Sequence, residues 1–256
     1  MLPMKTAASV AGGAWLAVLI LACWQTLSYF HVLDPLFFPP PSALLATLAS
    51  LLRSGEAERQ VAHTVIRTAA GFGVGVLWGA LASAILSLSA TLRRATEPLM
   101  AALYSTPRLT LLPMVMLLFG VNDAARIFLV AMGTALLMTI QISDAVRTVS
   151  RDYVDMAVNY GANRPMVIRK VYLLACLPQI FTALRIAYSR ALVLTISVEL
   201  LNCDDGLGSM IWNSWQTFAI EKLYVSIALA AMLGLLFQWL FHQLETRLAP
   251  WKEQPA

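Results

Sequence analysis

Charged residues are scarce in this sequence, where Asp, Glu, Lys and Arg together make up 12% of the 256 residues. A soluble domain carries about 25% charged residues to keep its surface hydrated. Hydrophobic residues account for 59% of the chain, and the mean hydropathy is +0.71. The shortage of charge excludes an ordinary soluble protein and predicts an integral membrane protein. We therefore assign the net charge of +4 to loops at the membrane surface and expect no nucleic-acid partner.

Cysteine is also rare, since the chain has only Cys23, Cys176 and Cys203, and these form no C-x-x-C pair. A disulfide framework or a thiolate metal site is therefore not expected. The chain contains no phosphate-binding G-x-x-x-x-G-K-[ST] motif, no H-E-x-x-H pair and no G-x-S-x-G nucleophile elbow. We expect a non-catalytic protein without a metal site.

Six stretches are long and apolar enough to cross a bilayer, which takes about 20 helical residues. The sequence predicts one all-α membrane domain over residues 1–256, with spans at about 11–30, 64–88, 99–119, 125–142, 179–201 and 223–241. In the second span, Gly71, Gly75 and Gly79 recur every four residues, which favours close packing against another helix. Between the first two spans, the apolar periodicity of residues 44–53 predicts a short amphipathic helix at the outer interface.

The distribution of Lys and Arg sets the orientation, because these residues accumulate on the cytoplasmic side. With six crossings and a cytoplasmic N-terminus, that side holds Lys5, Arg93, Arg94, Arg147, Arg151, Arg164, Arg169, Lys170, Arg247 and Lys252. The opposite side holds only Arg53, Arg59 and Lys222. We therefore expect both termini to be cytoplasmic.

The longest cytoplasmic loop, at about 150–177, carries clear helix signals. Ser150 can cap a helix over residues 152–160, and Gly161 can supply the left-handed residue that ends it. Asn163 and Pro165 can start a second short helix, and Pro178 follows at the entry to the fifth span. The pattern predicts two helices joined at Gly161, although a plain connecting hairpin would also fit.

Residues in this loop resemble the signature of binding-protein-dependent ABC importer permeases, which reads Glu-Ala-Ala, then Gly, then Ile or Leu followed by Pro. The matching positions are Asp155, Met156, Ala157, Gly161 with Ala162, and Leu177 with Pro178. The sequence departs from the signature at its first two positions, where Asp replaces Glu and Met replaces Ala. The resemblance implies that the loop is a coupling helix that docks on an ATPase subunit.

Further segments are similar to the permeases of nitrate, sulfonate and taurine importers, whose relatives also carry bicarbonate and thiamine-precursor pyrimidines. They are residues 38–43 (FPPPSA), 106–113 (TPRLTLLP), 119–123 (FGVND), 199–201 (ELL) and 206–208 (GLG). The resemblance implies a type I importer fold in the bacterial cytoplasmic membrane. It also implies that the chain binds no cofactor itself, while ATP and Mg²⁺ reside on the partner ATPase.

The same resemblance defines the partners. ATPase subunits work in pairs and each chain offers one docking loop, so we expect two ATPases and a second permease subunit, in the simplest case a copy of this chain. An external solute-binding protein would deliver the solute. The solute itself is expected to be a small anionic or polar molecule.

Polar residues inside predicted spans are candidates for the pathway, because a charge in the bilayer is costly unless it meets water or a partner. Arg108 lies about ten residues into the third span, between Pro107 and Pro113, where the helix can break. On the fifth span Arg185, Ser189, Thr195 and Glu199 fall near one face. These five residues either line a pathway or gate, or make structural contacts between helices, with Arg108 and Glu199 pairing as a brace.

An alternative function is a stand-alone secondary transporter driven by an ion gradient. Such a protein needs intramembrane acids and often shows paired broken helices in an internal repeat. Glu199 is the only acid placed inside a predicted span, and no such repeat is evident. The sequence therefore favours an ATP-driven permease over this alternative.

Overall fold

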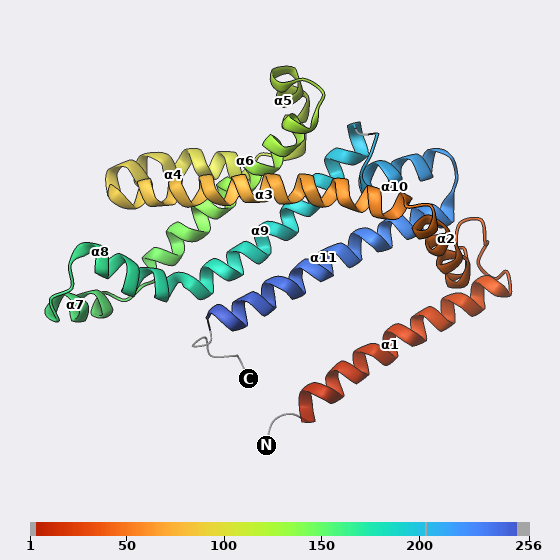
Figure 1. The fold of residues 1–256 in the computed structure, drawn as a ribbon, viewed down its shortest axis with the longest axis horizontal. Helices are drawn as coiled ribbons and strands as arrows, with labels where there is room; N and C mark the ends of the chain where they lie inside the picture. The colour runs from red at the N-terminus through yellow and green to blue at the C-terminus, as the bar shows by residue number, and fades with distance from the viewer. Residues whose placement is uncertain (1–3, 203, 250–256) are drawn as a thin grey trace.

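A computed structural model describes residues 4–202 and 204–249, with side chains over the same ranges except for 4–14, 88 and 202. The side chain of Lys5, the residues Cys203 and Lys252, and the ends of the predicted 1–256 domain lie outside this part. All secondary-structure elements in the described part of the chain are helices (Figure 1). In order these are α1 (Met4–Tyr29), α2 (Pro41–Arg53), α3 (Glu56–Leu88), α4 (Ala90–Ser105), η1 (Arg108–Leu111), α5 (Leu112–Phe119), α6 (Asp123–Arg147), α7 (Arg151–Asn159), α8 (Arg164–Val167), η2 (Ile168–Tyr172), α9 (Leu173–Asn202), α10 (Leu207–Gln216) and α11 (Ile220–Leu248).

Four helices in the described part are long and apolar enough to cross a membrane, or five if the bent pair formed by α4 and η1–α5 is one span. The four are α3, α6, the run from α8 through α9, and α11. Helix α1 is not among them, because its part with described side chains, Trp15–Tyr29, is a shorter apolar stretch. The all-α fold is confirmed, whereas the expected number of six spans is not.

The predicted third span is broken. Helix α4 ends at Ser105, Pro107 adopts an extended conformation, and η1 and α5 continue at an angle of 91° to α4. A proline cannot donate a backbone hydrogen bond, so Pro107 favours a break at this point. The break brings Arg108 to the first position of η1.

The glycines of α3 let α6 approach closely. A Cβ atom added at Gly71, Gly75 or Gly79 would lie 2.7, 2.5 and 2.6 Å from the Cβ atoms of Val130, Thr134 and Met138. Real side chains do not tolerate such distances, so glycine is required for this packing. Helix α9 also packs against α3 and α6, and these three helices form the centre of the bundle.

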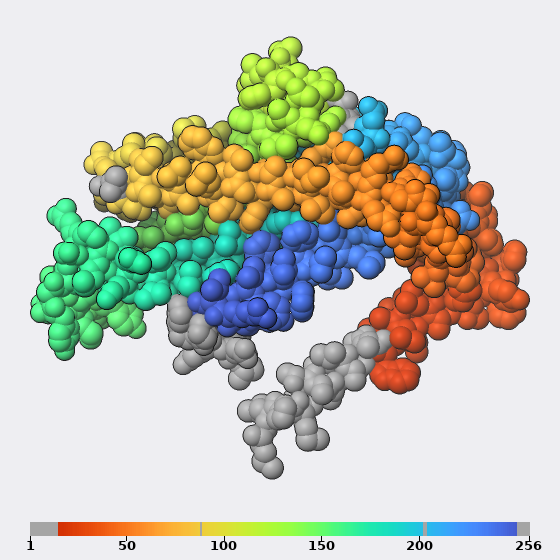
Figure 2. Space-filling model, viewed as in Figure 1, coloured from red at the N-terminus to blue at the C-terminus, as the bar shows by residue number. Residues whose placement is uncertain are grey.

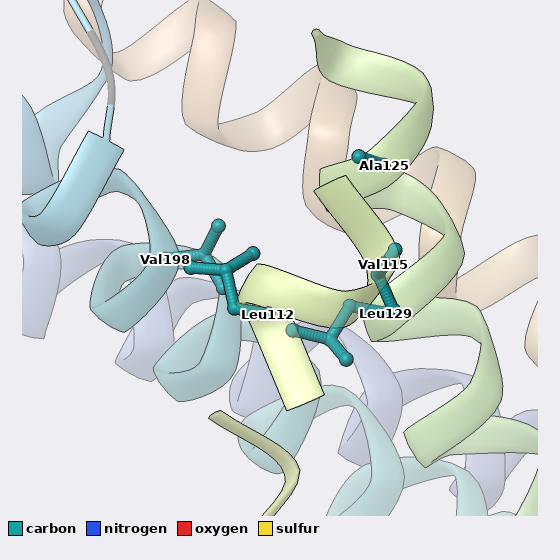
Figure 3. Packing of buried hydrophobic residues seen from close by; sticks show 5 residues of the cluster. All are labelled: Leu112, Val115, Ala125, Leu129 and Val198. Carbon is teal, nitrogen blue, oxygen red and sulfur yellow. The ribbon is translucent and has the colours of Figure 1, made fainter. Parts of the chain in front are cut away.

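Two groups of buried side chains fix the remaining helices. Leu112 and Val115 on the broken helix pack against Ala125 and Leu129 of α6 and Val198 of α9 (Figure 3). Tyr188 of α9 stacks on Phe237 of α11 with 4.2 Å between ring centroids, and it also contacts Phe72 and Phe241. Thus α11 packs on one side of α9. The broken helix, formed by α4, η1 and α5, packs on another side through α5.

Helix α1 stands apart from the other helices over most of its length and approaches them near its C-terminal end (Figure 1). It contacts α2, and Trp24 lies 5.6 Å from the ring of Tyr224 on α11. Helix α2 confirms the predicted amphipathic segment, because Leu51 is buried against α3, α10 and α11 and Gly55 follows with φ +69°. Helices α2 and α10 lie at the end of the bundle opposite α7 and α8.

The loop between α6 and α9 forms the predicted first helix, but the second one differs. Ser150 caps α7 by accepting from the backbone N–H of Asp152, and Asn163 caps α8 by accepting from Met166. From Arg164 onward, α8, η2 and α9 follow without interruption, so the second helix is the beginning of the long helix. Pro178 lies inside α9 and does not mark its entry, because a helix with packed neighbours tolerates the loss of one hydrogen bond.

Candidate functional site

Glu199 is an acceptor at the centre of a buried polar cluster. Only 1% of the residue is exposed. Its carboxylate accepts hydrogen bonds from Oγ1 of Thr64 (2.8 Å), Nη1 of Arg67 (3.0 Å) and the backbone N–H of Gly208 (3.1 Å). A buried carboxylate needs this number of donors to offset its lost hydration. Glu199 is therefore held in a structural ion pair with Arg67.

Arg67 connects four parts of the chain from its position on α3. It is 2% exposed. In addition to Glu199 on α9, its Nε donates to Oδ1 of Asp123 at the start of α6 (2.9 Å), and Nη1 donates to the backbone oxygen of Asp205 before α10 (2.9 Å). Its Nη2 also pairs with the carboxylate of Asp205. Because the guanidinium has five donors in a rigid plane, one side chain can join all these elements.

Arg67 falls within the predicted second span, at about 64–88, and no motif in the sequence indicates a role for it. One signal in the sequence could have identified its role. The fifth predicted span contains an acid, Glu199, and the second contains an arginine, Arg67, so the two could form an ion pair. The two helices are antiparallel, so both residues lie toward the same end of the bundle. The alternative pairing of Arg108 with Glu199 is wrong, because the donors to Glu199 come from Thr64, Arg67 and Gly208.

Two glycines leave room for this cluster at the start of α10. Gly206 has φ +101°, and a Cβ atom there would collide with the carboxylate of Glu199. A Cβ atom on Gly208 would collide with the backbone oxygen of Ile196. The backbone N–H of Gly206 donates to Oε1 of Gln60 across 2.6 Å. The Gly-Leu-Gly segment is thus explained by close approach of α10 to α9 and α3.

The predicted stripe on α9 is divided by the bundle. Thr195 and Glu199 are buried, at 2% and 1% exposure, and Arg185 pairs with Glu245 of α11 across 3.7 Å. Only Ser189 faces the hollow that Arg108 lines. The four residues span about 120° around a helix with 3.6 residues per turn, so a bundle can bury one edge and expose the other.

A hollow of about 540 Å³ lies between the broken helix and α9. Tyr104 and Arg108 line it from one side, and Ser189, Arg190 and Ser197 line it from the other. The residues around this hollow include no Asp or Glu. Nε and Nη2 of Arg108 are shielded from solvent and have no hydrogen-bond partner within the described residues. The lining of the hollow therefore has an excess of positive charge, which suits an anion.

Five of the predicted coupling residues lie on α7 and the turn after it, at the end of the bundle opposite α2 and α10. Ala157, Gly161 and Ala162 form a Schellman motif at the end of α7, in which the N–H of Ala162 donates to the oxygen of Ala157 (3.0 Å) and that of Gly161 donates to Val158 (2.9 Å). Gly161 has φ +82°, as this motif requires. The signature residues therefore fix the direction in which the chain leaves α7.

Asp155 and Met156 are exposed on α7, and Met156 contributes to a groove of about 550 Å³ between α7 and the start of the long helix. Tyr153 and Tyr160 line the same groove and are 61% and 88% exposed. Leu177 and Pro178 lie inside α9 and not in the loop. Apolar side chains of this size on a polar loop form a surface suited to protein contact.

A family model described as "Binding-protein-dependent transport system inner membrane component" matches residues 72–250. The chain belongs to this family. The aliphatic sulfonates transport permease SsuC of Escherichia coli (strain K12), named as putative, is 30% identical over 86% of this chain and 84% of its own length. The taurine transport permease TauC of the same strain is 27% identical over 92% of this chain and 87% of its own length.

A solved structure of the MetNI methionine ABC transporter in an inward-facing conformation shares the fold of the permease. The TM-score is 0.65 at 18% identity, and the match covers 72% of this chain and 92% of that chain.

The protein is thus the permease subunit of an ABC importer, a multi-pass membrane component that works with an ATPase and a binding protein. It is a non-catalytic subunit, and ATP is hydrolysed by a separate chain. No group of three metal-binding side chains occurs within the described residues.

Proposed function

We propose that the permease imports a small anion, of the class that includes sulfonates and nitrate, after delivery by an external binding protein. One observation carries this proposal: Arg108 and Arg190 line the same hollow, and no carboxylate lines it. A guanidinium binds sulfonate, carboxylate or nitrate oxygens through paired hydrogen bonds, which a lysine ammonium does not reproduce. The names of the relatives, which are permeases for taurine and aliphatic sulfonates, support the same class.

Two copies of the chain would form the pathway between them. Helix α5 stands out from the bundle (Figure 2), and Leu117 and Leu118 on it are 86% and 69% exposed. These side chains, together with the exposed face of α9, offer an apolar surface for a second copy. Two permease copies would present two α7 helices, one for each ATPase subunit. ATP and Mg²⁺ would be bound by those ATPases, and both termini of the permease would be cytoplasmic.

The transport proposal is tested with the complete importer in proteoliposomes. Uptake of radiolabelled taurine, methanesulfonate and nitrate is measured with the partner binding protein outside the vesicles and ATP inside. We expect ATP-dependent uptake of at least one anion and no uptake of dimethyl sulfone, a neutral analogue of methanesulfonate. Transport driven by an ion gradient without ATP would favour a secondary transporter. Uptake of neutral solutes alone would contradict the proposed solute class.

The coupling proposal is tested by cross-linking. A cysteine in place of Met156, which is exposed on α7, should form a cross-link with the ATPase subunit in the assembled complex. A cysteine in place of Glu58, exposed near the start of α3 at the opposite end of the bundle, serves as the control and should not. Equal cross-linking of the two variants would remove the support for docking at α7.

A further inference from the structure

Tyr104 contacts two arginines that come from different parts of the chain. It occupies the last turn of α4, while Arg108 begins η1 and Arg190 lies in the middle of α9. The guanidinium carbon of Arg108 is 5.4 Å from the centroid of the Tyr104 ring, and that of Arg190 is 5.9 Å away. Both distances fall within the range of cation–π contact. The aromatic ring therefore contacts both of the positive charges that line the hollow from opposite sides.

The hydrogen bonding of the two arginines is incomplete. Nη1 of Arg190 donates to the hydroxyl of Tyr104 across 2.7 Å. A neutral hydroxyl is a weaker partner for a guanidinium than an oxyanion, because the anion brings an opposite charge and can accept two parallel hydrogen bonds. Nε and Nη2 of Arg108 have no partner within the described residues. An oxyanion in the hollow would therefore give both guanidiniums a charged partner, which neither has among the described residues.

The position of Arg108 is fixed from behind by α6. A Cβ atom on Gly133 would lie 2.8 Å from Cδ and 3.2 Å from Nε of Arg108, so the side chain rests directly on the α6 backbone. A guanidinium held in this way loses little freedom when it binds. The absence of a side chain at Gly133 thus determines where the donors of Arg108 point.

We infer that Tyr104, Arg108 and Arg190 form a single oxyanion-binding site, in which the Tyr104 hydroxyl occupies a donor of Arg190 until the anion displaces it. The inference rests on the proposed function and adds a second arginine and a competing hydroxyl to it. The ligand is an anion with at least two oxygens on one centre, such as a sulfonate, carboxylate or nitrate group. Binding exchanges the Tyr104–Arg190 hydrogen bond for one to the anion, and the ring remains in contact with both cations.

The test is equilibrium dialysis of radiolabelled methanesulfonate against the purified permease–ATPase complex, without the binding protein. Arg108→Gln and Arg190→Gln should each weaken binding about ten- to hundredfold, which corresponds to the loss of a hydrogen bond to a charged group. Tyr104→Phe keeps the ring and removes the competing hydroxyl, so it should tighten binding about two- to tenfold. Arg59→Gln, which removes an exposed arginine outside the hollow, is the matched control and should bind like the wild type.

Arg108→Lys and Arg190→Lys guard against loss of folding, because both keep the charge while removing the paired donors. They should also bind more weakly, in complexes that assemble and hydrolyse ATP. Wild-type affinity in the arginine variants would overturn the site, and wild-type or weaker binding in Tyr104→Phe would overturn the competing hydroxyl. If these results occur while the wild-type importer still transports anions, the proposed function stands and the inference fails. If the wild-type importer transports no anion, the proposed function itself fails.

Discussion

Arg67 on α3 donates from Nη1 to Oε1 of Glu199 on α9 across 3.0 Å, although 132 positions separate the two residues in the sequence. Both side chains are almost completely buried, with 3% and 0% of their surface exposed. A charge in such a place needs a fixed partner, because moving it out of water is expensive. The pair therefore joins the two helices that flank α10 and holds the Gly206 turn against them.

Replacing Arg67 by methionine should strongly destabilise the permease, since Glu199 would lose its cation while remaining buried. Removing one member of a buried ion pair costs about 3–5 kcal/mol. We expect Arg67→Met to lower the apparent melting temperature and the membrane yield of the complex. The double variant Arg67→Met/Glu199→Gln should lose less than the sum of the two single variants, because the residues are in contact.

The control for this cycle combines Arg108→Ala with Glu199→Gln. No hydrogen bond or ion pair joins Arg108 and Glu199 in the described part of the chain. Their effects on the melting temperature should therefore add. Additive effects in the Arg67 cycle, or coupled effects in the Arg108 cycle, would show that the pairing differs from the one described.

Gly133→Ala should weaken anion binding without disturbing membrane insertion. The added methyl group would lie 2.8 Å from Cδ of Arg108, so the flexible arginine side chain has to move away from α6. The loss of one well-directed hydrogen bond corresponds to about a two- to tenfold loss of affinity. Gly73→Ala is the matched control, because no atom lies within 4 Å of a Cβ there. Methanesulfonate binding by the purified complex measures both, and equal affinities would remove the role of Gly133.

The sequence allowed the helices to be predicted well where local signals act alone. The caps at Ser150 and Asn163 and the left-handed Gly161 depend on one or two neighbouring residues, and all three are found in the structure. The break after Ser105 was also expected from Pro107. Such features follow from backbone chemistry and need no knowledge of the tertiary contacts.

Features that depend on the packing of several helices could not be read from the sequence. The stripe containing Arg185, Ser189, Thr195 and Glu199 shares one face by periodicity, but only the bundle decides which of its edges is buried. Likewise, Pro178 is a plausible helix boundary in the sequence, yet neighbouring helices keep α9 continuous through it. To predict a pair across the bundle, such as Arg67 with Glu199, one must know how the two helices are positioned relative to each other along the bundle axis.

The orientation of the permease can be measured by labelling introduced cysteines in intact cells. In a variant with Cys23, Cys176 and Cys203 replaced by alanine, a cysteine at Glu58 should react with a membrane-impermeant maleimide. A cysteine at Asn159, the last residue of α7, should react only after the membrane is opened. Both positions are exposed, and they lie at opposite ends of the bundle, so accessibility depends on the side of the membrane.

The expected result follows from the basic residues near α7, because Lys and Arg accumulate on the cytoplasmic side. Labelling of Asn159→Cys in intact cells, together with protection of Glu58→Cys, would invert the orientation. In that case α7 could not reach a cytoplasmic ATPase, and the coupling proposal would have to be abandoned.

Gly161→Val should separate ATP hydrolysis from transport. Gly161 has φ +82°, and a Cβ atom there would meet no atom within 4 Å, so the only obstacle to a side chain is the backbone conformation. A residue with a branched Cβ in the left-handed region is strained by about 1–2 kcal/mol. Relief of this strain would change the direction in which the chain leaves α7 and misplace the helix on the ATPase. We expect ATP hydrolysis by the assembled complex to continue while uptake falls.

Gly161→Asn is the matched control, because asparagine tolerates the left-handed conformation better than other residues with a side chain. Both variants add a side chain at the same exposed position, so they differ mainly in the strain of the backbone. Uptake and ATP hydrolysis are measured for each in proteoliposomes, with the amount of assembled complex determined in parallel. The asparagine variant should retain most of the coupling that the valine variant loses if the Schellman motif sets the position of α7. Equal uptake by Gly161→Val and the wild type, at equal abundance, would mean that the loop serves only as a connection between α6 and α9.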